Sequence, residues 1–179
     1  MAGSRCALLK HARGLTVEIG AGTGENLPAY PRLDRLVLVE PSPAMRRRLE
    51  PRARRWEAEV VDATAEHLPF ADASVDTVVC TLVLCSVDDP QVALREIRRV
   101  LHPGGRLLLL EHVRAADARV AVWQDRVDPF WKVAARGCHP NRATLDEVER
   151  AGFTLFEQHN IPVVMPGARF VPHVAAVAG

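Results

Sequence analysis

The sequence predicts a doubly wound α/β domain with a seven-stranded sheet, mostly parallel with one antiparallel strand near the C-terminus. Three observations predict this fold. Short apolar runs alternate with longer amphipathic stretches, as in parallel sheets whose strands are joined by helical crossovers. The run at residues 75–80 is almost continuously apolar, which is typical of a parallel strand covered on both faces. The last two runs follow each other without an amphipathic stretch, so one of them should run antiparallel.

The predicted strands are the apolar runs that carry this pattern. They cover residues 15–19, 36–39, 57–61, 75–80, 107–110, 153–160 and 171–177. Proline and glycine between the last two predict a hairpin or a wide loop.

The first helix starts are marked by capping chemistry. Ser42 and Asp89 each precede a proline, the pattern of a cap followed by proline at the first helical position. The helix from Ser42 should run toward Glu50, and residues 102–105 should end the helix from Asp89 by turn chemistry. A helix should also begin near residues 23–25 and stay short, because Pro28 would fall in its first turn.

Two further segments follow downstream, and the second is predicted to be a helix. A long tryptophan-bearing segment covers residues 116–135. Thr144 with Glu147 three positions later reads as a capping box, in which the threonine is the cap. We expect that helix to close at Gly152.

Composition limits the class of protein. The 179 residues are enough for one domain, and we expect residues 1–179 to form it alone. A net charge of +1 gives no reason to expect nucleic acid as a partner. No apolar stretch approaches the ~20 residues that span a bilayer, and no signal-peptide pattern is present, so we expect a cytoplasmic protein without a transmembrane segment. The basic run at residues 46–48 reads as a solvated helix surface.

Cysteine and histidine spacing predicts neither disulfides nor a metal. The cysteines at 6, 80, 85 and 138 show no metal-type or secreted-framework spacing, so we expect reduced thiols. The seven histidines are scattered, and none pairs with a cysteine at ligand spacing. Cys85 follows an apolar run and reads as a small buried hydrophobic side chain.

The most informative stretch is the glycine turn after the first strand. Gly20, Gly22 and Gly24 alternate, so backbone can lie against a ligand at the end of a parallel strand. A dinucleotide loop would place its third glycine where Glu25 stands. Glu18 adds a second carboxylate just before the turn. Two acids around this turn favour a cationic ligand over a pyrophosphate.

The ends of the next three strands carry suitable polar groups. Glu40 follows the second strand and could accept both hydroxyls of a ribose. Asp62 follows the third and could accept an exocyclic amino group, with the Ala63 amide facing a ring nitrogen. Thr81 closes the fourth, where main-chain carbonyls could face an ammonium group. Because ligands of open parallel sheets bind beyond the carboxyl ends of the strands, we expect these groups to converge.

Residues 15–112 resemble the class I S-adenosylmethionine-dependent methyltransferases, which have a Rossmann-like fold. The acid-x-G-x-G-x-G run at 18–24, the stretch 60–76 and the stretch 93–105 carry the resemblance. It implies S-adenosylmethionine as cofactor, with S-adenosylhomocysteine as product. The implied pocket residues are Glu18, Gly20, Gly22, Gly24, Glu40, Asp62, Ala63 and Thr81.

A narrower likeness is to the methyltransferase-like thiol S-methyltransferases and their bacterial relatives. It is carried by residues 79–87, 111–113, 137–138 and 172–173, together with Trp123, Trp131 and Arg142. Only about fifteen residues precede the glycine turn, so the N-terminal cap over the substrate is expected to be shortened. A more open pocket, or cover by a partner subunit in a homodimer, would follow from that.

These features predict methyl transfer to a small apolar acceptor, with a thiol as one candidate. Methylation of a lipid head group or quinone-like ring is a second reading, and a non-catalytic cofactor-binding module is a third. A nicotinamide oxidoreductase is disfavoured by the displaced glycine. His112, just past the fifth strand, is the candidate to orient or deprotonate the acceptor. Trp123, Phe130 and Trp131 could wall an acceptor pocket or pack a helix on the sheet.

Overall fold

The computed structural model describes residues 2–135, 137–161 and 171–179, and it contains one seven-stranded sheet with helices on both faces. The strand order is β3-β2-β1-β4-β5-β7-β6. β1 (Leu15–Ile19), β2 (Arg35–Val39), β3 (Glu59–Val61), β4 (Val75–Thr81) and β5 (Leu101–His112) pair in parallel. β7 (His173–Ala178) runs antiparallel to both β5 and β6 (Leu155–Ile161). The predicted fold class and the single antiparallel strand are therefore confirmed.

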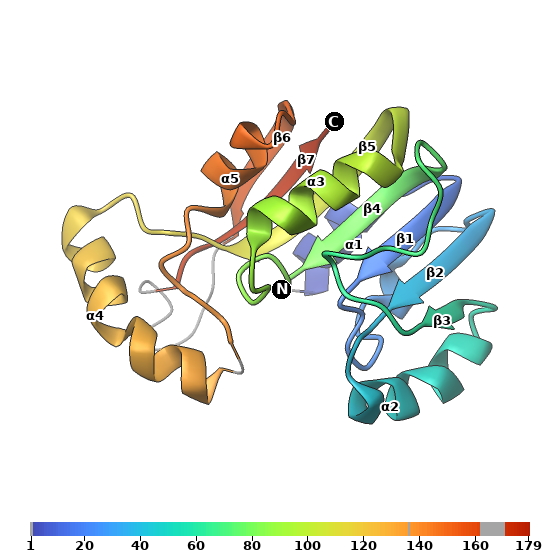
Figure 1. Cartoon of the computed structure of the whole chain (residues 1–179), viewed down its shortest axis with the longest axis horizontal. Helices are drawn as coiled ribbons and strands as arrows, with labels where there is room; N and C mark the ends of the chain where they lie inside the picture. The colour runs from blue at the N-terminus through green and yellow to red at the C-terminus, as the bar shows by residue number, and fades with distance from the viewer. Residues whose placement is uncertain (1, 136, 162–170) are drawn as a thin grey trace.

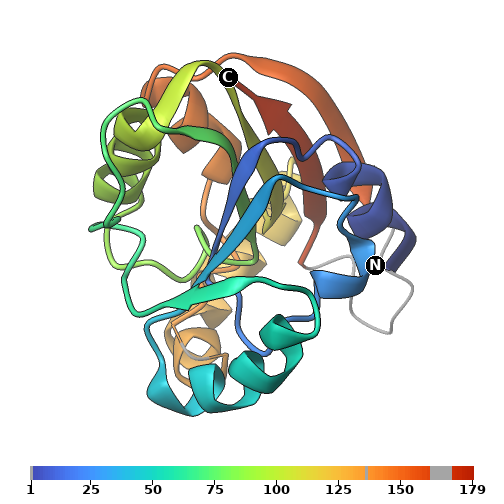
Figure 2. The ribbon, with the colours of Figure 1, turned by 90° about the vertical axis from the view of Figure 1, so that its right-hand side faces the viewer.

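Two apolar cores, one on each face of the sheet, hold the layers together. One face packs against α3 (Pro90–Val100) and α5 (Thr144–Arg150). The other packs against α1 (Ala2–Leu9), the 3-10 turn η1 (Leu27–Ala29) and α2 (Pro43–Arg54). Figure 2 shows α1 and α3 on opposite sides of the twisted sheet. Leu107 and Leu109 enter the first core, and Leu108 and Leu110 the second, because successive side chains of a strand face opposite ways.

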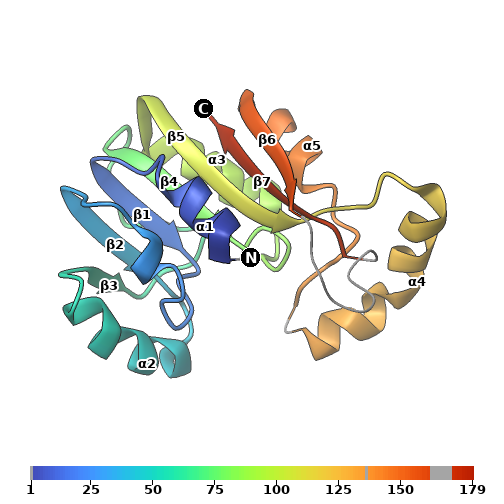
Figure 3. The same ribbon diagram turned by 180° about the vertical axis from the view of Figure 1, so that it is seen from behind.

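α4 (Ala118–Ala134) stands away from the sheet, at the opposite end of the molecule from α2 (Figures 1 and 3). It lies within the tryptophan-bearing segment 116–135. Phe130, expected either to wall a pocket or to pack on the sheet, is instead 78% exposed. Among the described residues, none of the helices is long and apolar enough to cross a membrane.

Two caps were predicted correctly, and one was not. Ser42 accepts a hydrogen bond from the Met45 amide, and Asp89 accepts from the amides of the first helical turn, with proline next in both cases. The Thr144 capping box is wrong: the helix begins at Thr144, and the cap residue, Ala143, makes no side-chain bond. The Thr144 hydroxyl instead donates to the His112 carbonyl, 3.1 Å away, which fixes the end of β5 to α5.

Three other boundaries differ from expectation for local reasons. No α-helix begins at residues 23–25; a turn and η1 occupy the segment, since Pro28 lacks the amide that a helix would need. β3 begins at Glu59 rather than residue 57, because Glu57 has a left-handed φ of 53° that a strand cannot contain. β5 begins at Leu101, so residues 102–105 form an irregular part of that strand and not a separate turn.

One helix near the N-terminus was not predicted. The sequence pattern did not reveal α1, which packs its buried Leu8 and Leu9 under the sheet. The hairpin or wide loop expected between β6 and β7 lies outside the described residues.

Candidate functional site

The glycine turn lies at the carboxyl end of β1, and its backbone is left-handed at all three glycines. A Cβ atom at Gly20 would lie 2.6 Å from Val83 Cγ2, and one at Gly24 would lie 2.8 Å from Leu27 Cδ1. These two positions therefore need glycine for close packing as well as for φ. At Gly22 a Cβ would meet no atom closer than 4.0 Å, so this side of the turn faces open space.

Glu40, at the end of β2, fixes the shape of this turn. Its Oε2 accepts the Gly22 amide at 2.8 Å, and its Oε1 accepts the Ser42 amide at 2.9 Å. The residue is only 6% exposed. Each carboxylate oxygen keeps a further acceptor position, so the group can still take hydrogen bonds from a ligand's hydroxyls.

A cavity of about 520 Å³ opens in front of the turn, within the usual range of small-ligand sites. It lies beyond the carboxyl ends of β1, β2 and β4. Its charged lining groups, among the described residues, are all carboxylates: Glu40, Glu66 and Asp88. The remaining lining is mostly apolar and comes from Ile19, Met45, Leu82, Val83, Val87 and Ala135, among others. Such a cavity suits a ligand with a positive charge and a hydroxylated part.

Glu18 does not line the cavity; it is buried beneath the glycine turn and bonds to residues that follow the turn. Its carboxylate accepts Asn26 Nδ2 at 2.9 Å and the Tyr30 hydroxyl at 2.8 Å, and the residue is 2% exposed. Burial raises the pKa of Glu18 to about 7, against the lowering effect of the two hydrogen bonds. Asn26 Nδ2 also donates to Thr81 Oγ1, while its buried Oδ1 has no partner among the described residues. That free acceptor is compatible with a cationic donor nearby.

Asp62 and Ala63 border a second, adjoining hollow, which shares Thr64 with the cavity. The Asp62 carboxylate is 65% exposed and is held by both terminal nitrogens of Arg46, each at 2.6 Å. Arg46 also donates to the carbonyls of Glu40 and Pro41, so it links the ends of β2 and β3. The basic run gave no indication of this role, because one arginine of three turns inward.

The segment after β4 forms the next wall of the cavity. Glu111, fully buried at the end of β5, accepts the amides of Val83, Leu84 and Cys85 at 2.8, 3.0 and 3.2 Å. Burial raises the pKa of Glu111, and the three amides oppose that shift. The adjacent Leu82 has a φ of 58°, a strained conformation for leucine. The Glu111 carboxylate therefore fixes the shape of this wall. In the sequence, this role is indicated only by an acidic residue at the end of an apolar strand.

Cys85, His112 and Cys138 meet beside this wall, although they are far apart in the sequence. His112 Nδ1 lies 3.1 Å from Cys138 Sγ, and the two sulfur atoms lie 3.6 Å apart. The Cys85 thiol and the His112 ring lower the pKa of Cys138 to about 4, whereas the hydrogen bond with Cys138 and burial raise the pKa of Cys85. The His173 ring packs edge-on against His112, and burial lowers its pKa to about 4. Spacing along the chain could not reveal this group.

The predicted site residues thus fall into four groups. Gly20, Gly22 and Glu40 line the cavity. Glu18, Gly24 and Thr81 support it from behind. Asp62 and Ala63 border the adjoining hollow, and His112 lies with the two cysteines.

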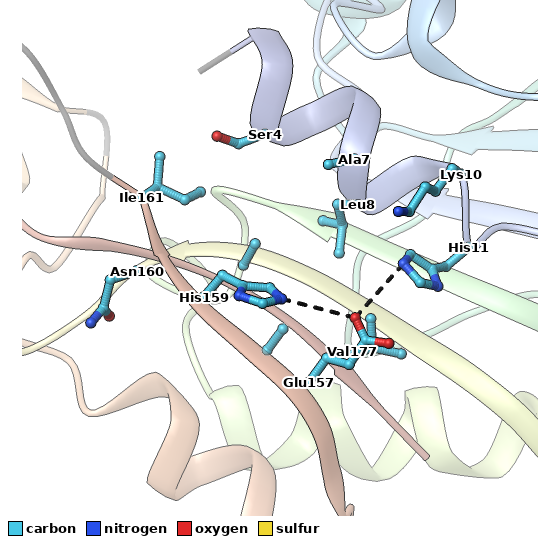
Figure 4. A pocket seen from close by; sticks show the side chains of 12 residues that line it. Ser4, Ala7, Leu8, Lys10, His11, Glu157, His159, Asn160, Ile161 and Val177 are labelled. Atoms are coloured by element: carbon cyan, nitrogen blue, oxygen red, sulfur yellow. Dashed lines mark ion pairs between the residues drawn. The ribbon is translucent and has the colours of Figure 1, made fainter.

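A separate groove of about 190 Å³ lies between α1 and the strands β6 and β7, and Figure 4 shows it from close by. Glu157 lies there between His11 and His159, at 3.8 and 4.0 Å. None of the predicted site residues lines it. The cavity at the glycine turn, where the predicted residues gather, is therefore the candidate site.

The strand order, with the glycine turn after β1 and the acid after β2, is that of a Rossmann-like α/β fold. Residues 17–109 match the methyltransferase domain family. Human thiol S-methyltransferase TMT1B is 36% identical over 185 residues, covering 96% of this chain and 76% of that protein. The UbiE ubiquinone/menaquinone biosynthesis C-methyltransferase of Hahella chejuensis is 32% identical over 171 residues, covering 81% of this chain and 69% of that protein.

The solved structure of the YcgJ protein from Bacillus subtilis superposes with a TM-score of 0.79 at 20% identity, covering 100% of this chain and 98% of that one. At that identity the likeness concerns the fold alone. The family match and the two relatives show, in addition, which family the chain belongs to. The chain belongs to the class I S-adenosylmethionine-dependent methyltransferases, and S-adenosylmethionine is its cofactor.

Proposed function

We propose that this methyltransferase acts on a small apolar thiol, and that its cofactor lies against the glycine turn. The observation that carries the proposal is the charge of the cavity: the described lining residues include three carboxylates and no basic side chain. A sulfonium donor is favoured there, and a neutral acceptor is preferred to an anionic one. The 36% identity to human thiol S-methyltransferase TMT1B supports a thiol.

In this proposal the cofactor contacts follow the strand ends. Gly20 and Gly22 offer bare backbone, and Glu40 accepts the ribose hydroxyls. Asp62 and the Ala63 amide receive the adenine, with Arg46 holding the Asp62 carboxylate in place. Glu18, Gly24 and Thr81 keep the turn in shape.

The chemistry asks little of the protein beyond alignment. The bound cofactor supplies a methyl group on a positively charged sulfur that leaves as a neutral thioether. Positioning of the two reactants can contribute about 7–11 kcal/mol in favourable cases. A thiol with a pKa of about 8.5 is already a few per cent ionised at neutral pH, so modest assistance is enough. We propose that His112, half-buried at the end of β5, orients the acceptor or assists its deprotonation.

The test combines binding with turnover. Calorimetry should find S-adenosylhomocysteine binding and no comparable binding of a dinucleotide. Mass spectrometry should then detect methyl thioethers from alkyl thiols, with phenols, quinols and amines as parallel acceptors. Methylation of a ring compound in preference to every thiol would refute the acceptor class. Binding without transfer to any acceptor would favour a non-catalytic module.

A further inference from the structure

Three metal-ligating atoms from three distant parts of the chain converge beside the cavity. Cys85 Sγ, one ring nitrogen of His112 and Cys138 Sγ all lie within 4.8 Å of one another. In a tetrahedral zinc site with Zn–S near 2.3 Å and Zn–N near 2.0–2.1 Å, ligand atoms are separated by about 3.5–3.8 Å. The observed 3.6 Å between the sulfur atoms and 3.1 Å between Nδ1 and Cys138 Sγ are close to those separations. We propose that Cys85, His112 and Cys138 bind a Zn²⁺ ion.

The backbone around Cys85 is held in place by groups that do not themselves ligate. The Glu111 carboxylate accepts the Cys85 amide, and the Cys85 carbonyl accepts the His139 amide at 2.7 Å. Arg142 donates to the carbonyls of Leu84 and Val87 on either side. Because these bonds join the segment after β4 to the segment holding Cys138, the two thiols face each other without help from an ion.

His112 is fixed in the same way from the other side. Its carbonyl accepts the Thr144 hydroxyl, and its ring packs against the edge of His173 with centroids 4.3 Å apart. Its Nδ1 already points at Cys138. Both contacts restrict the orientation of the imidazole before any ion binds.

The ligand set selects the kind of ion. Two thiolates and an imidazole favour a soft or borderline cation such as Zn²⁺ over Mg²⁺ or Ca²⁺. The two cysteines are 1% and 5% exposed, which shields an ion from competing water. Two thiolate charges would also neutralise the dication, so burial of the complex carries little net charge.

Three protein ligands leave a fourth position, the arrangement of zinc sites that bind a substrate or water. Ser86 borders the cavity, and its Oγ lies 3.5 Å from Cys85 Sγ. A small ligand in the cavity can therefore approach the cluster along Ser86. If the proposed thiol acceptor holds, that ligand is the acceptor, and His112 then orients it through the ion and is not its base. The acceptor sulfur binds the ion, and its proton passes to water. The same sulfur then forms the new S–CH₃ bond, and the electron pair of the broken sulfonium bond remains on S-adenosylhomocysteine.

The experiment uses the reduced, chelator-treated full chain and adds ZnCl₂. Wild type should retain equimolar zinc after gel filtration. Cys85→Ser and Cys138→Ser should each bind it about tenfold more weakly or worse, since even outer partners of zinc ligands contribute roughly 10–100-fold. Cys6→Ser, at an exposed position on α1, is the matched control and should bind like wild type. Circular dichroism and S-adenosylhomocysteine binding establish that each variant folds.

A second measurement needs no variant. Co²⁺ added to the wild-type protein should give thiolate-to-cobalt charge-transfer absorption, and Zn²⁺ should protect Cys85 and Cys138, but not Cys6, from alkylation. Absence of that absorption, equal alkylation of all three, or wild-type zinc content equal to that of Cys85→Ser would overturn the site. A Cys85–Cys138 disulfide in reductant-free protein that does not take up zinc after reduction would overturn it too. Zinc uptake without thiol methylation would uphold the site and refute only the thiol acceptor.

Discussion

Glu18 gives a quantitative test of how the glycine turn is supported. The change is Glu18→Gln in the cofactor-free protein. Burial raises the pKa of Glu18 from an ordinary 4.5 to about 7, so the folded protein holds a proton there that the unfolded chain has released. Glutamine imitates the protonated side chain and can keep one acceptor and one donor toward Asn26 and Tyr30.

The sign and size follow from proton linkage. Between about pH 4.5 and 7 the native state binds more protons than the unfolded state, so stability falls as pH rises through that window. The full shift corresponds to about 3 kcal/mol, at roughly 1.4 kcal/mol per pKa unit. The unfolding free energy of Glu18→Gln minus that of wild type should therefore increase by about 3 kcal/mol from pH 4.5 to pH 8.

Urea unfolding at a series of pH values measures this difference directly. Glu25→Gln is the control, because Glu25 is an exposed carboxylate of the same turn, and Arg52 lowers its pKa. For Glu25→Gln, the difference in unfolding free energy from wild type should not change between pH 5 and pH 8. A Glu18→Gln difference that stays constant over the same range would refute the reasoning.

Three further changes test the cavity. Glu40→Ala should weaken S-adenosylhomocysteine binding at least about tenfold, because a charge-assisted hydrogen bond contributes about 1.5–3 kcal/mol; equal calorimetric affinities would remove Glu40 from the site. His112→Ala should reduce turnover more than it reduces cofactor binding, and unchanged turnover with a thiol would exclude a role for His112. Gly20→Ala should destabilise the protein by more than Gly22→Ala, since φ is similar (63° and 58°) but only the first Cβ meets Val83, at 2.6 Å. Adding Val83→Ala should restore part of the loss, and urea midpoints in the opposite order would contradict this account.

The strands were predictable because their signal is local. An apolar run with the right length needs no knowledge of its neighbours, and all seven runs became strands of one sheet. Cap residues before proline were equally local, as at Ser42 and Asp89. Thr144 shows where such reasoning fails: a distant carbonyl, that of His112, competes successfully for the hydroxyl.

The site was predictable only where each residue acts from its own strand end. Gly20, Gly22 and Glu40 meet because parallel strands end at one edge of the sheet. The inward turn of Arg46 depends on a carboxylate sixteen positions later, and the thiol–imidazole group depends on a contact across 53 positions. No periodicity encodes either contact.

The position of β7 has a consequence for how the protein is made. It is the last strand of the described chain, yet it lies between β5 and β6 and supplies the hydrogen-bonding partner of both. On the ribosome, the backbone hydrogen-bonding groups along one edge of β5 must therefore wait unpaired until residues 173–178 have emerged. A chain without residues 173–178 would leave β5 and β6 without the strand that both pair with, and such unpaired edges invite aggregation.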